Sequence, residues 1–213
     1  PSIWIMFAAI FSDTDHALNH PNSWMTTRQY NMLKRWTELY DNLYMYNYLY
    51  FNLVGNGAPP IPLARRHRQE MPLLKQLGIA GFWEKGRTVR GESGIFPHYL
   101  RARMMWDADL DANALAVEYF TNWYGAAAEP AFEFWDAMER AIENSIFGGN
   151  EDHMLCLAFT LELIHQLQLH LSLAEKLAEG NARAEPRVKA DRAEFNANWT
   201  EAAKQEESRR PSA

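Results

Sequence analysis

The apolar and aromatic positions of this chain follow two patterns, one after the other. In the first part, short apolar runs of strand length alternate with segments that repeat apolar residues at helical spacing. The runs predict strands at residues 3–11, 43–50 and 79–83, and the periodic segments predict helices at residues 26–40 and 62–77. Strands separated by helices indicate a parallel sheet with crossover connections, so the predicted class is α/β.

From residue 95 onward the strand signals vanish and the helical period continues. The charged end of the chain, residues 208–213, has too little apolar content to pack and predicts a disordered tail. We therefore expect an α/β part at residues 1–94 and a helical C-terminal region at residues 95–207. The helices of that region are predicted at residues 97–106, 112–124, 129–146, 152–179 and 185–207.

The strand–helix rhythm is that of a (β/α)8 barrel, but three strands are too few to close one. The chain begins Pro1-Ser2-Ile3-Trp4, without methionine, and enters a strand pattern at once. No charged and apolar leader explains this start. We expect the C-terminal part of a TIM-type barrel with about three parallel strands, whose N-terminal part and targeting information are missing. The compartment, secreted, periplasmic or cytoplasmic, therefore stays open.

The composition is typical of a folded domain and argues against nucleic-acid binding and membrane insertion. Of the 213 residues, 47% are hydrophobic, which is enough for a sizeable core. The formal net charge of −6 and the lack of a long basic patch argue against a nucleic-acid partner. No run of about 18 apolar residues occurs, so no membrane span is predicted. The single cysteine, Cys156, cannot form an internal disulfide and is predicted to fill the core.

Polar and aromatic residues gather where the predicted strands end. The carboxyl ends of parallel strands share one edge of the sheet, and in (β/α)8 barrels that edge carries the active site. The candidate residues close or follow the three strands: Asp13, Asp15, His16, Tyr46, Asn47, Trp83 and Glu84.

Glu84 is the candidate for the catalytic role, because it ends the third strand beside apolar residues that would raise the pKa of its carboxyl. A structural carboxylate paired with Lys85, Arg87 or Arg90 is the alternative. Trp83 would either stack its flat ring on a substrate or pack between the sheet and its helices. Adjacent strand residues point to opposite faces, which favours Glu84 in the cleft and Trp83 in packing.

The other candidates each have a substrate-binding and a structural interpretation. Asp13, Asp15 and His16 would bind substrate hydroxyls or supply a second carboxyl group, or their segment forms an Asx turn or helix cap. Tyr46 and Asn47 lie on opposite faces of the second strand, because the side-chain period of a strand is two. Either residue would contact substrate, or the tyrosine face forms an aromatic layer against the helices.

Asp107, Asp109, Asp111 and Glu118 have the spacing of carboxylates in a calcium-binding loop. That loop needs glycine at its sixth position, where this chain has Ala112. A helix cap formed by Asp109 or Asp111 is therefore the preferred interpretation. No zinc-hydrolase, phosphate-loop, dinucleotide or serine-hydrolase motif occurs, so we predict no metal and no organic cofactor.

Three segments together resemble a bacterial family catalogued as domain of unknown function 4838. They are residues 43–48, 77–86 and 99–127, in the same order and spacing, and the resemblance covers residues 1–146. It implies a glycoside hydrolase with a (β/α)8 barrel and a helical C-terminal region, similar to α-glucuronidases and hexosaminidase-like barrels. The family tends to have an aspartate where this chain has Asn47, so a carboxylate role there is lost.

These patterns and this resemblance predict hydrolysis of a glycosidic bond in an oligo- or polysaccharide by two carboxyl groups. Their separation is about 5–5.5 Å in retaining enzymes and about 6.5–9.5 Å in inverting enzymes. The second hypothesis is a carbohydrate-binding protein that has lost catalysis, which Asn47 supports. The third is a helical scaffold for partner proteins on residues 152–207, which requires an exposed apolar patch. The glycan, the stereochemistry and the oligomeric state stay open.

Overall fold

The computed structural model describes residues 3–9, 13, 15–48, 64–85, 95–146 and 158–209. The strands β1 (Ile5–Ala8), β2 (Leu43–Tyr48) and β3 (Gly81–Lys85) form one parallel sheet in this order. The helices α1 (Trp24–Thr37) and α2 (Ala64–Gln76) connect consecutive strands. The predicted α/β class with a parallel sheet is confirmed.

The first crossover helix, α1, begins two residues before its predicted start. Ser23 has an extended backbone, and its side chain accepts the N–H of Thr26 at 3.3 Å, so Ser23 is the N-cap. Thr26 and Thr27, the first threonines of the predicted helix, already lie inside it and do not cap it.

The third strand begins later in the sequence than predicted, because a turn at Gly78 separates it from α2. Gly78 has a φ of +74°, in the left-handed region that glycine adopts without a Cβ penalty. The N–H of Ile79 donates to the carbonyl of Leu74 at 3.1 Å, which closes the end of α2. The strand therefore begins at Gly81, two residues after its predicted start, and Glu84 lies inside the strand instead of after it.

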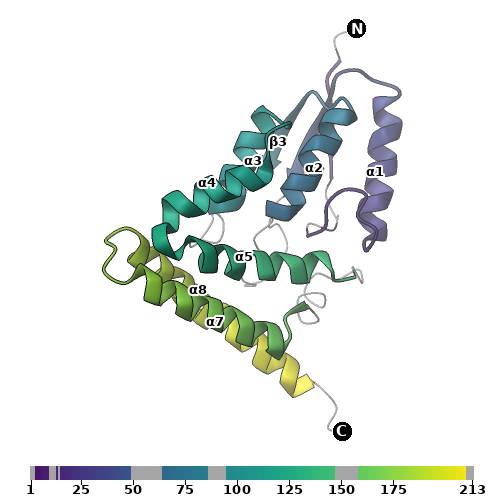
Figure 1. Cartoon of the computed structure of the whole chain (residues 1–213). Helices are drawn as coiled ribbons and strands as arrows, with labels where there is room; N and C mark the ends of the chain where they lie inside the picture. Colours follow the sequence, from purple (N-terminus) through teal and green to yellow (C-terminus); the bar gives the residue numbers. More distant parts are fainter. Residues whose placement is uncertain are drawn as a thin grey trace.

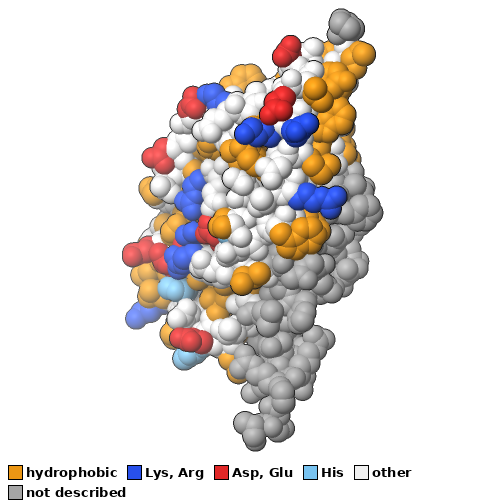
Figure 2. All heavy atoms as spheres, turned by 90° about the vertical axis from the view of Figure 1, so that its right-hand side faces the viewer, with side chains coloured by type: hydrophobic (Ala, Val, Ile, Leu, Met, Phe, Trp, Pro, Cys, Tyr) orange, Lys and Arg blue, Asp and Glu red, His pale blue; other side chains and the backbone are white. Residues whose placement is uncertain are grey.

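The two faces of the sheet have different surroundings. Met45 and Asn47 are buried on one face, where Asn47 contacts a side chain of α2. On the opposite face Trp4, Met6 and Trp83 are exposed, and no helix of the described part packs over them. Figure 2 shows hydrophobic side chains gathered along the upper right margin of that view, close to the N-terminal end. One sheet face within the described ranges thus lacks a helical layer.

The second part of the chain is helical in all its described ranges. Figure 1 shows α3 beside α2, α5 across the lower ends of α1 and α2, and α7 and α8 paired below α5. None of the described helices combines the length and apolar content that a membrane span requires. The elements are α3 (Ile95–Trp106), α4 (Ala112–Tyr124), the 3-10 turn η3 (Gly125–Ala127), α5 (Ala128–Glu143), α7 (Leu161–Ala178) and α8 (Ala184–Arg209).

Polar caps set the starts of two of these helices. Asp111 accepts the N–H of Asn113 at 2.8 Å at the start of α4, which confirms the cap interpretation of this aspartate. Thr160 has an extended backbone and caps α7, so the prediction of one helix over residues 152–179 is wrong at this position. Residues 147–157, with Cys156, lie outside the described part.

The apolar stripes predicted for the helical region are largely buried, with two exceptions. Ile146 is exposed because α5 ends before it, and Leu161 is exposed at the first position of α7. At the other end of the chain, α8 extends to Arg209, two residues beyond its predicted end. The residues of the two stripes that are buried are Trp135, Met138, Ile142, Ile164 and Leu171.

Gly81→Ala should destabilise the protein by about 1–3 kcal/mol, because an added methyl group overpacks this site. A Cβ at position 81 would lie 2.5 Å from Cε1 of Tyr44, whose ring covers the glycine on the helix-free face of the sheet. Urea denaturation gives the change in the free energy of unfolding. In a Tyr44→Ala background the same substitution should cost little. An equal cost in both backgrounds would contradict the proposed contact.

Candidate functional site

The carboxyl-end edge of the sheet is joined to the end of α5. The loop after β1 carries His16 and Asn22, and both contact backbone carbonyls at this end of α5. The ring Nε2 of His16 lies 3.0 Å from the carbonyl of Ser145, and the amide of Asn22 donates to the carbonyl of Glu143 at 3.3 Å. Figure 1 shows α5 lying across this edge. The helical region therefore covers the edge at which the sequence predicts a site.

Asp13 organises the loop after β1 through three contacts. One carboxylate oxygen accepts the N–H groups of Asp15 at 2.9 Å and His16 at 3.1 Å, which is the geometry of the predicted turn. The other oxygen lies 2.7 Å from Nδ1 of His16, and both side chains are fully buried. Burial opposes ionisation of Asp13, but the hydrogen bond and charge of His16 outweigh it, so the pKa of this carboxyl is lowered.

The ring of His16 is held between two acceptors, the carboxylate of Asp13 and the carbonyl of Ser145. Each ring nitrogen thus lies within hydrogen-bond distance of one acceptor. The ring thus links the first strand to the end of α5 and has no face left open to solvent. Asp13 and His16 position the loop in this structure.

The inner face of α2 carries a second buried polar network. Glu70 accepts the N–H of Leu18 at 3.1 Å and the Nε–H of Arg66 at 2.9 Å. Arg66 also donates to the side-chain oxygen of Asn47 at 3.3 Å. Asn47 therefore lies on the helix-covered face of β2, where it connects the end of the strand to α2.

Arg65, at the start of α2, binds two carboxylates of α5. Its Nε lies 2.7 Å from Asp136, and its Nη1 lies 2.6 Å from Glu143. Burial disfavours the charged guanidinium, but the hydrogen bonds and charges of Asp136 and Glu143 outweigh it and raise the pKa of Arg65. This forked pairing fixes α5 against the N-terminus of α2.

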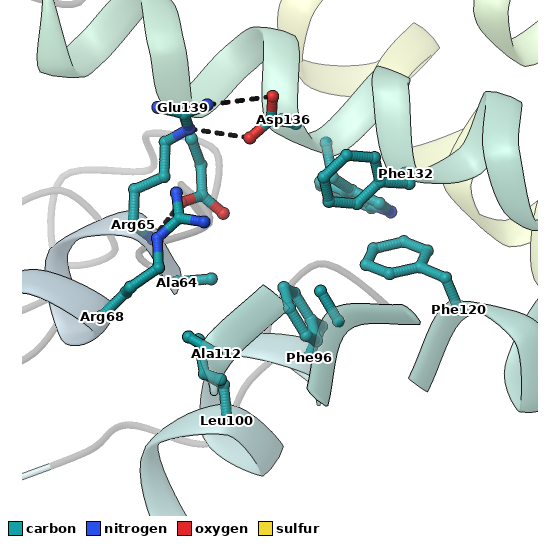
Figure 3. A pocket seen from close by; sticks show the side chains of 12 residues that line it. Ala64, Arg65, Arg68, Phe96, Leu100, Ala112, Phe120, Phe132, Asp136 and Glu139 are labelled. Carbon is teal, nitrogen blue, oxygen red and sulfur yellow. Dashed lines mark hydrogen bonds and ion pairs between the residues drawn. The ribbon is translucent and has the colours of Figure 1, made fainter. Parts of the chain in front are cut away.

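Glu139 of α5 caps α2 from outside the helix. Its carboxylate accepts the backbone N–H of Arg65, one of the N–H groups that a helix leaves unpaired at its start. Complete burial, together with the charge of Asp136, raises the pKa of Glu139 to about 7. Figure 3 shows this charged side, with Arg65, Asp136 and Glu139, facing an aromatic side formed by Phe96, Phe120 and Phe132 across a narrow pocket.

The spacing of the three acidic residues on α5 could have predicted their contact with another element, although the sequence analysis considered only the apolar residues of this helix. Asp136, Glu139 and Glu143 are spaced by three and four residues, so they share one face of α5. That face lies next to the buried stripe of the same helix, and Asp136 and Glu139 are themselves buried. Acidic residues on a face that packs against other elements indicate a polar partner, which here is the start of α2.

Tyr46 and Trp83 lie on the opposite, helix-free face of the sheet. They are register partners in adjacent parallel strands, and Trp83 is 62% exposed. Trp83 therefore does not pack between the sheet and its helices, contrary to the interpretation that strand alternation favoured. Glu84 lies in β3 as the register partner of Asn47. Arg87 and Arg90, its suggested ion-pair partners, lie outside the described residues.

The structure thus divides the predicted site residues into two groups. Asp13, His16 and Asn47 belong to buried networks among the loop after β1, α2 and α5. Asp15 is also buried and lines a narrow cavity beside this network with His20, Arg65 and Glu143. Tyr46 and Trp83 share the exposed face. Within the described ranges, no three acidic, histidine or cysteine side chains are placed to hold a metal ion.

Comparison with known proteins identifies a family. A family model described as Domain of unknown function (DUF4838) matches residues 1–136. The matched range contains the three strands, the helices from α1 to α4, and α5 as far as Asp136. No curated protein and no solved structure matches this chain. The family predicted from the sequence segments is confirmed.

Glu139→Gln should flatten the pH dependence of stability. The variant keeps an oxygen that accepts the N–H of Arg65 but no longer titrates. Because the pKa rises from 4.5 to about 7 in the folded state, that state holds a proton that the unfolded state loses in this interval. The free energy of unfolding of the wild type should therefore fall, relative to the variant, between about pH 5 and pH 7.

The difference should level off above about pH 8 at no more than about 3 kcal/mol. Urea denaturation at several pH values measures it. Glu133→Gln is the matched control, because Glu133 is on the same helix but largely exposed. If the free energies of unfolding of the wild type and Glu139→Gln differ by the same amount at every pH in this range, Glu139 does not titrate there as a buried carboxyl group.

Proposed function

The chain belongs to the DUF4838 family, and we propose that its sheet is part of a (β/α)8 barrel that hydrolyses glycosidic bonds. In this proposal the substrate is an oligo- or polysaccharide, and it lies against the helix-free face of the sheet near the carboxyl ends of the strands. Sites at that position are the rule among barrel enzymes.

The observation that carries the proposal is a pair of aromatic residues on this face, of which Trp83 is exposed and Tyr46 is half-buried. Trp83 and Tyr46 are register partners, and neighbouring strands lie about 4.8 Å apart, so both rings are within reach of one sugar unit. Trp83 is a large apolar ring in an exposed position, which suits the C–H side of a pyranose. The hydroxyl of Tyr46 would bind a sugar hydroxyl.

Glu84 follows Trp83 directly in β3 and is the register partner of Asn47, so strand alternation assigns it to the face opposite Trp83. We propose that the chain bends at the end of this strand and brings the carboxyl group of Glu84 to the sugar on Trp83, and we assign this group to catalysis. It would protonate the leaving oxygen of the glycosidic bond, and a second carboxyl group would attack the sugar or activate water. Asp13, Asp15 and His16 would have a supporting role, because they hold the loop after β1 at the same edge of the sheet. Asn47 would keep the end of β2 fixed to α2.

A second candidate function is carbohydrate binding without catalysis. The register partner of Glu84 is Asn47, and the amide of Asn47 is engaged by Arg66. This pair at the strand ends therefore contains one carboxyl group, whereas glycoside hydrolysis usually needs two. The aromatic pair would serve a binding protein equally well.

Trp83→Ala and Glu84→Gln separate the two functions. If Glu84 is catalytic, Glu84→Gln should lower the release of reducing sugar about 10²–10⁴-fold and leave sugar affinity nearly unchanged. Trp83→Ala should weaken affinity about 5- to 100-fold through the lost stacking area. Calorimetric titration with an oligosaccharide panel and a reducing-sugar assay measure both properties.

Trp106→Ala is the matched control, because Trp106 is an exposed tryptophan at the end of α3, outside the sheet. Equal sugar affinities for Trp83→Ala and Trp106→Ala would remove the aromatic pair from the site. Turnover that survives Glu84→Gln would contradict the catalytic assignment. Binding by the wild type without any turnover would select the second candidate function.

A further inference from the structure

The outer face of α7 carries an exposed row of leucines. The inner face of this helix is buried against α5 and α8 through residues such as Ile164, Leu167 and Leu171. On the outer face, four leucine side chains are between 43% and 60% exposed. They are Leu161, Leu169, Leu173 and Leu177. Leu169, Leu173 and Leu177 follow one another at four-residue spacing, whereas Leu161 lies on the other edge of this face, about 160° from Leu177 around the helix.

The outer face is symmetric about Leu169. Residues at equal distances on either side of it have matching or complementary character. The outermost pair is apolar, the next pair is acidic and basic, and the third pair is polar. These pairs are Leu161 with Leu177, Glu162 with Lys176, and Gln166 with Ser172. A fourth pair joins His165 with Leu173, where the imidazole body packs against the leucine.

We propose that this face binds a second copy of the chain, with the two α7 helices antiparallel and their twofold axis at Leu169. In this arrangement the residues near the middle of the face meet their counterparts on the other helix, so Leu169 contacts Leu169 and His165 lies beside Leu173. Self-complementary patches of this kind are what a twofold interface needs.

The charges determine the direction of the pairing. Glu162 and Lys176 each lie seven residues from Leu169, which places both within about 20° of the same side of the helix. In the antiparallel pair, Glu162 of one copy faces Lys176 of the other, twice. In a parallel pair, like charges would face each other at both positions.

Both charges are available for such contacts. Within the described part of the chain, neither Glu162 nor Lys176 forms an ion pair or a hydrogen bond through its side chain. Their neighbour Glu175 differs, because Arg192 of α8 binds it at 2.9 Å. The facing residues, from Glu162 to Lys176, span about 21 Å of helix. One helix pair of this length buries less area than a standard interface, so we expect association in the micromolar range.

Sedimentation of the full chain over a range of concentrations tests the proposal. The wild type should form dimers at about 10–100 µM, and Leu169→Glu should weaken dimerisation at least about tenfold by placing two carboxylates at the twofold axis. Val117→Glu is the matched control, because Val117 is an exposed apolar residue on α4. It should leave the dimer unchanged.

Charge reversal tests the antiparallel direction. Glu162→Lys and Lys176→Glu should each weaken the dimer at low salt, and the double variant should restore it, because opposite charges then face each other again. In a parallel dimer each charged residue would face its own copy. A single charge reversal would then leave two like charges facing each other, as in the wild type.

A chain that stays monomeric throughout the concentration range would overturn the proposal. A dimer that resists Leu169→Glu, or single reversals that leave its stability unchanged, would overturn it as well. Circular dichroism of each variant ensures that the compared proteins are folded.

Discussion

The contact between the start of α2 and the acidic face of α5 is the interaction on which the arrangement of the two parts depends. A helix start carries unpaired N–H groups and a partial positive charge. Glu139 accepts the N–H of Arg65, and the side chain of Arg65 binds Asp136 and Glu143. This contact lays α5 across the carboxyl-end edge of the sheet and brings the carbonyl of Ser145 to His16.

The helix α2 also holds the sheet in place, because its other buried polar residues bind the loop after β1 and the end of β2. Glu70 and Arg66 connect the loop after β1 with Asn47 at the end of β2. A buried network of this kind contributes little net stability, since desolvation offsets much of the attraction. It does exclude other packings, because every displaced partner would leave a buried charge unsatisfied. These contacts therefore fix the helix-covered face of the sheet.

The sequence predicted what local patterns encode. The strand–helix alternation, the cap at Asp111 and the family all follow from residues close together in the chain. The covered face of β2 could not be predicted, because an alternating strand offers two faces and only long-range partners select one. Arg66 lies 19 residues from Asn47, and Ser145 lies 129 residues from His16. The assignment of Trp83 to packing failed for the same reason.

The position of α5 also bears on where the independent unit of this protein ends. The family match stops at Asp136, in the middle of that helix. Glu139, Glu143 and Ser145, which bind the start of α2 and the ring of His16, all come after this point. A polypeptide cut where the sequence similarity stops would retain the sheet and lose these partners. The segment that the family model matches and the segment held together by these contacts therefore end at different places, and the second extends at least to Ser145.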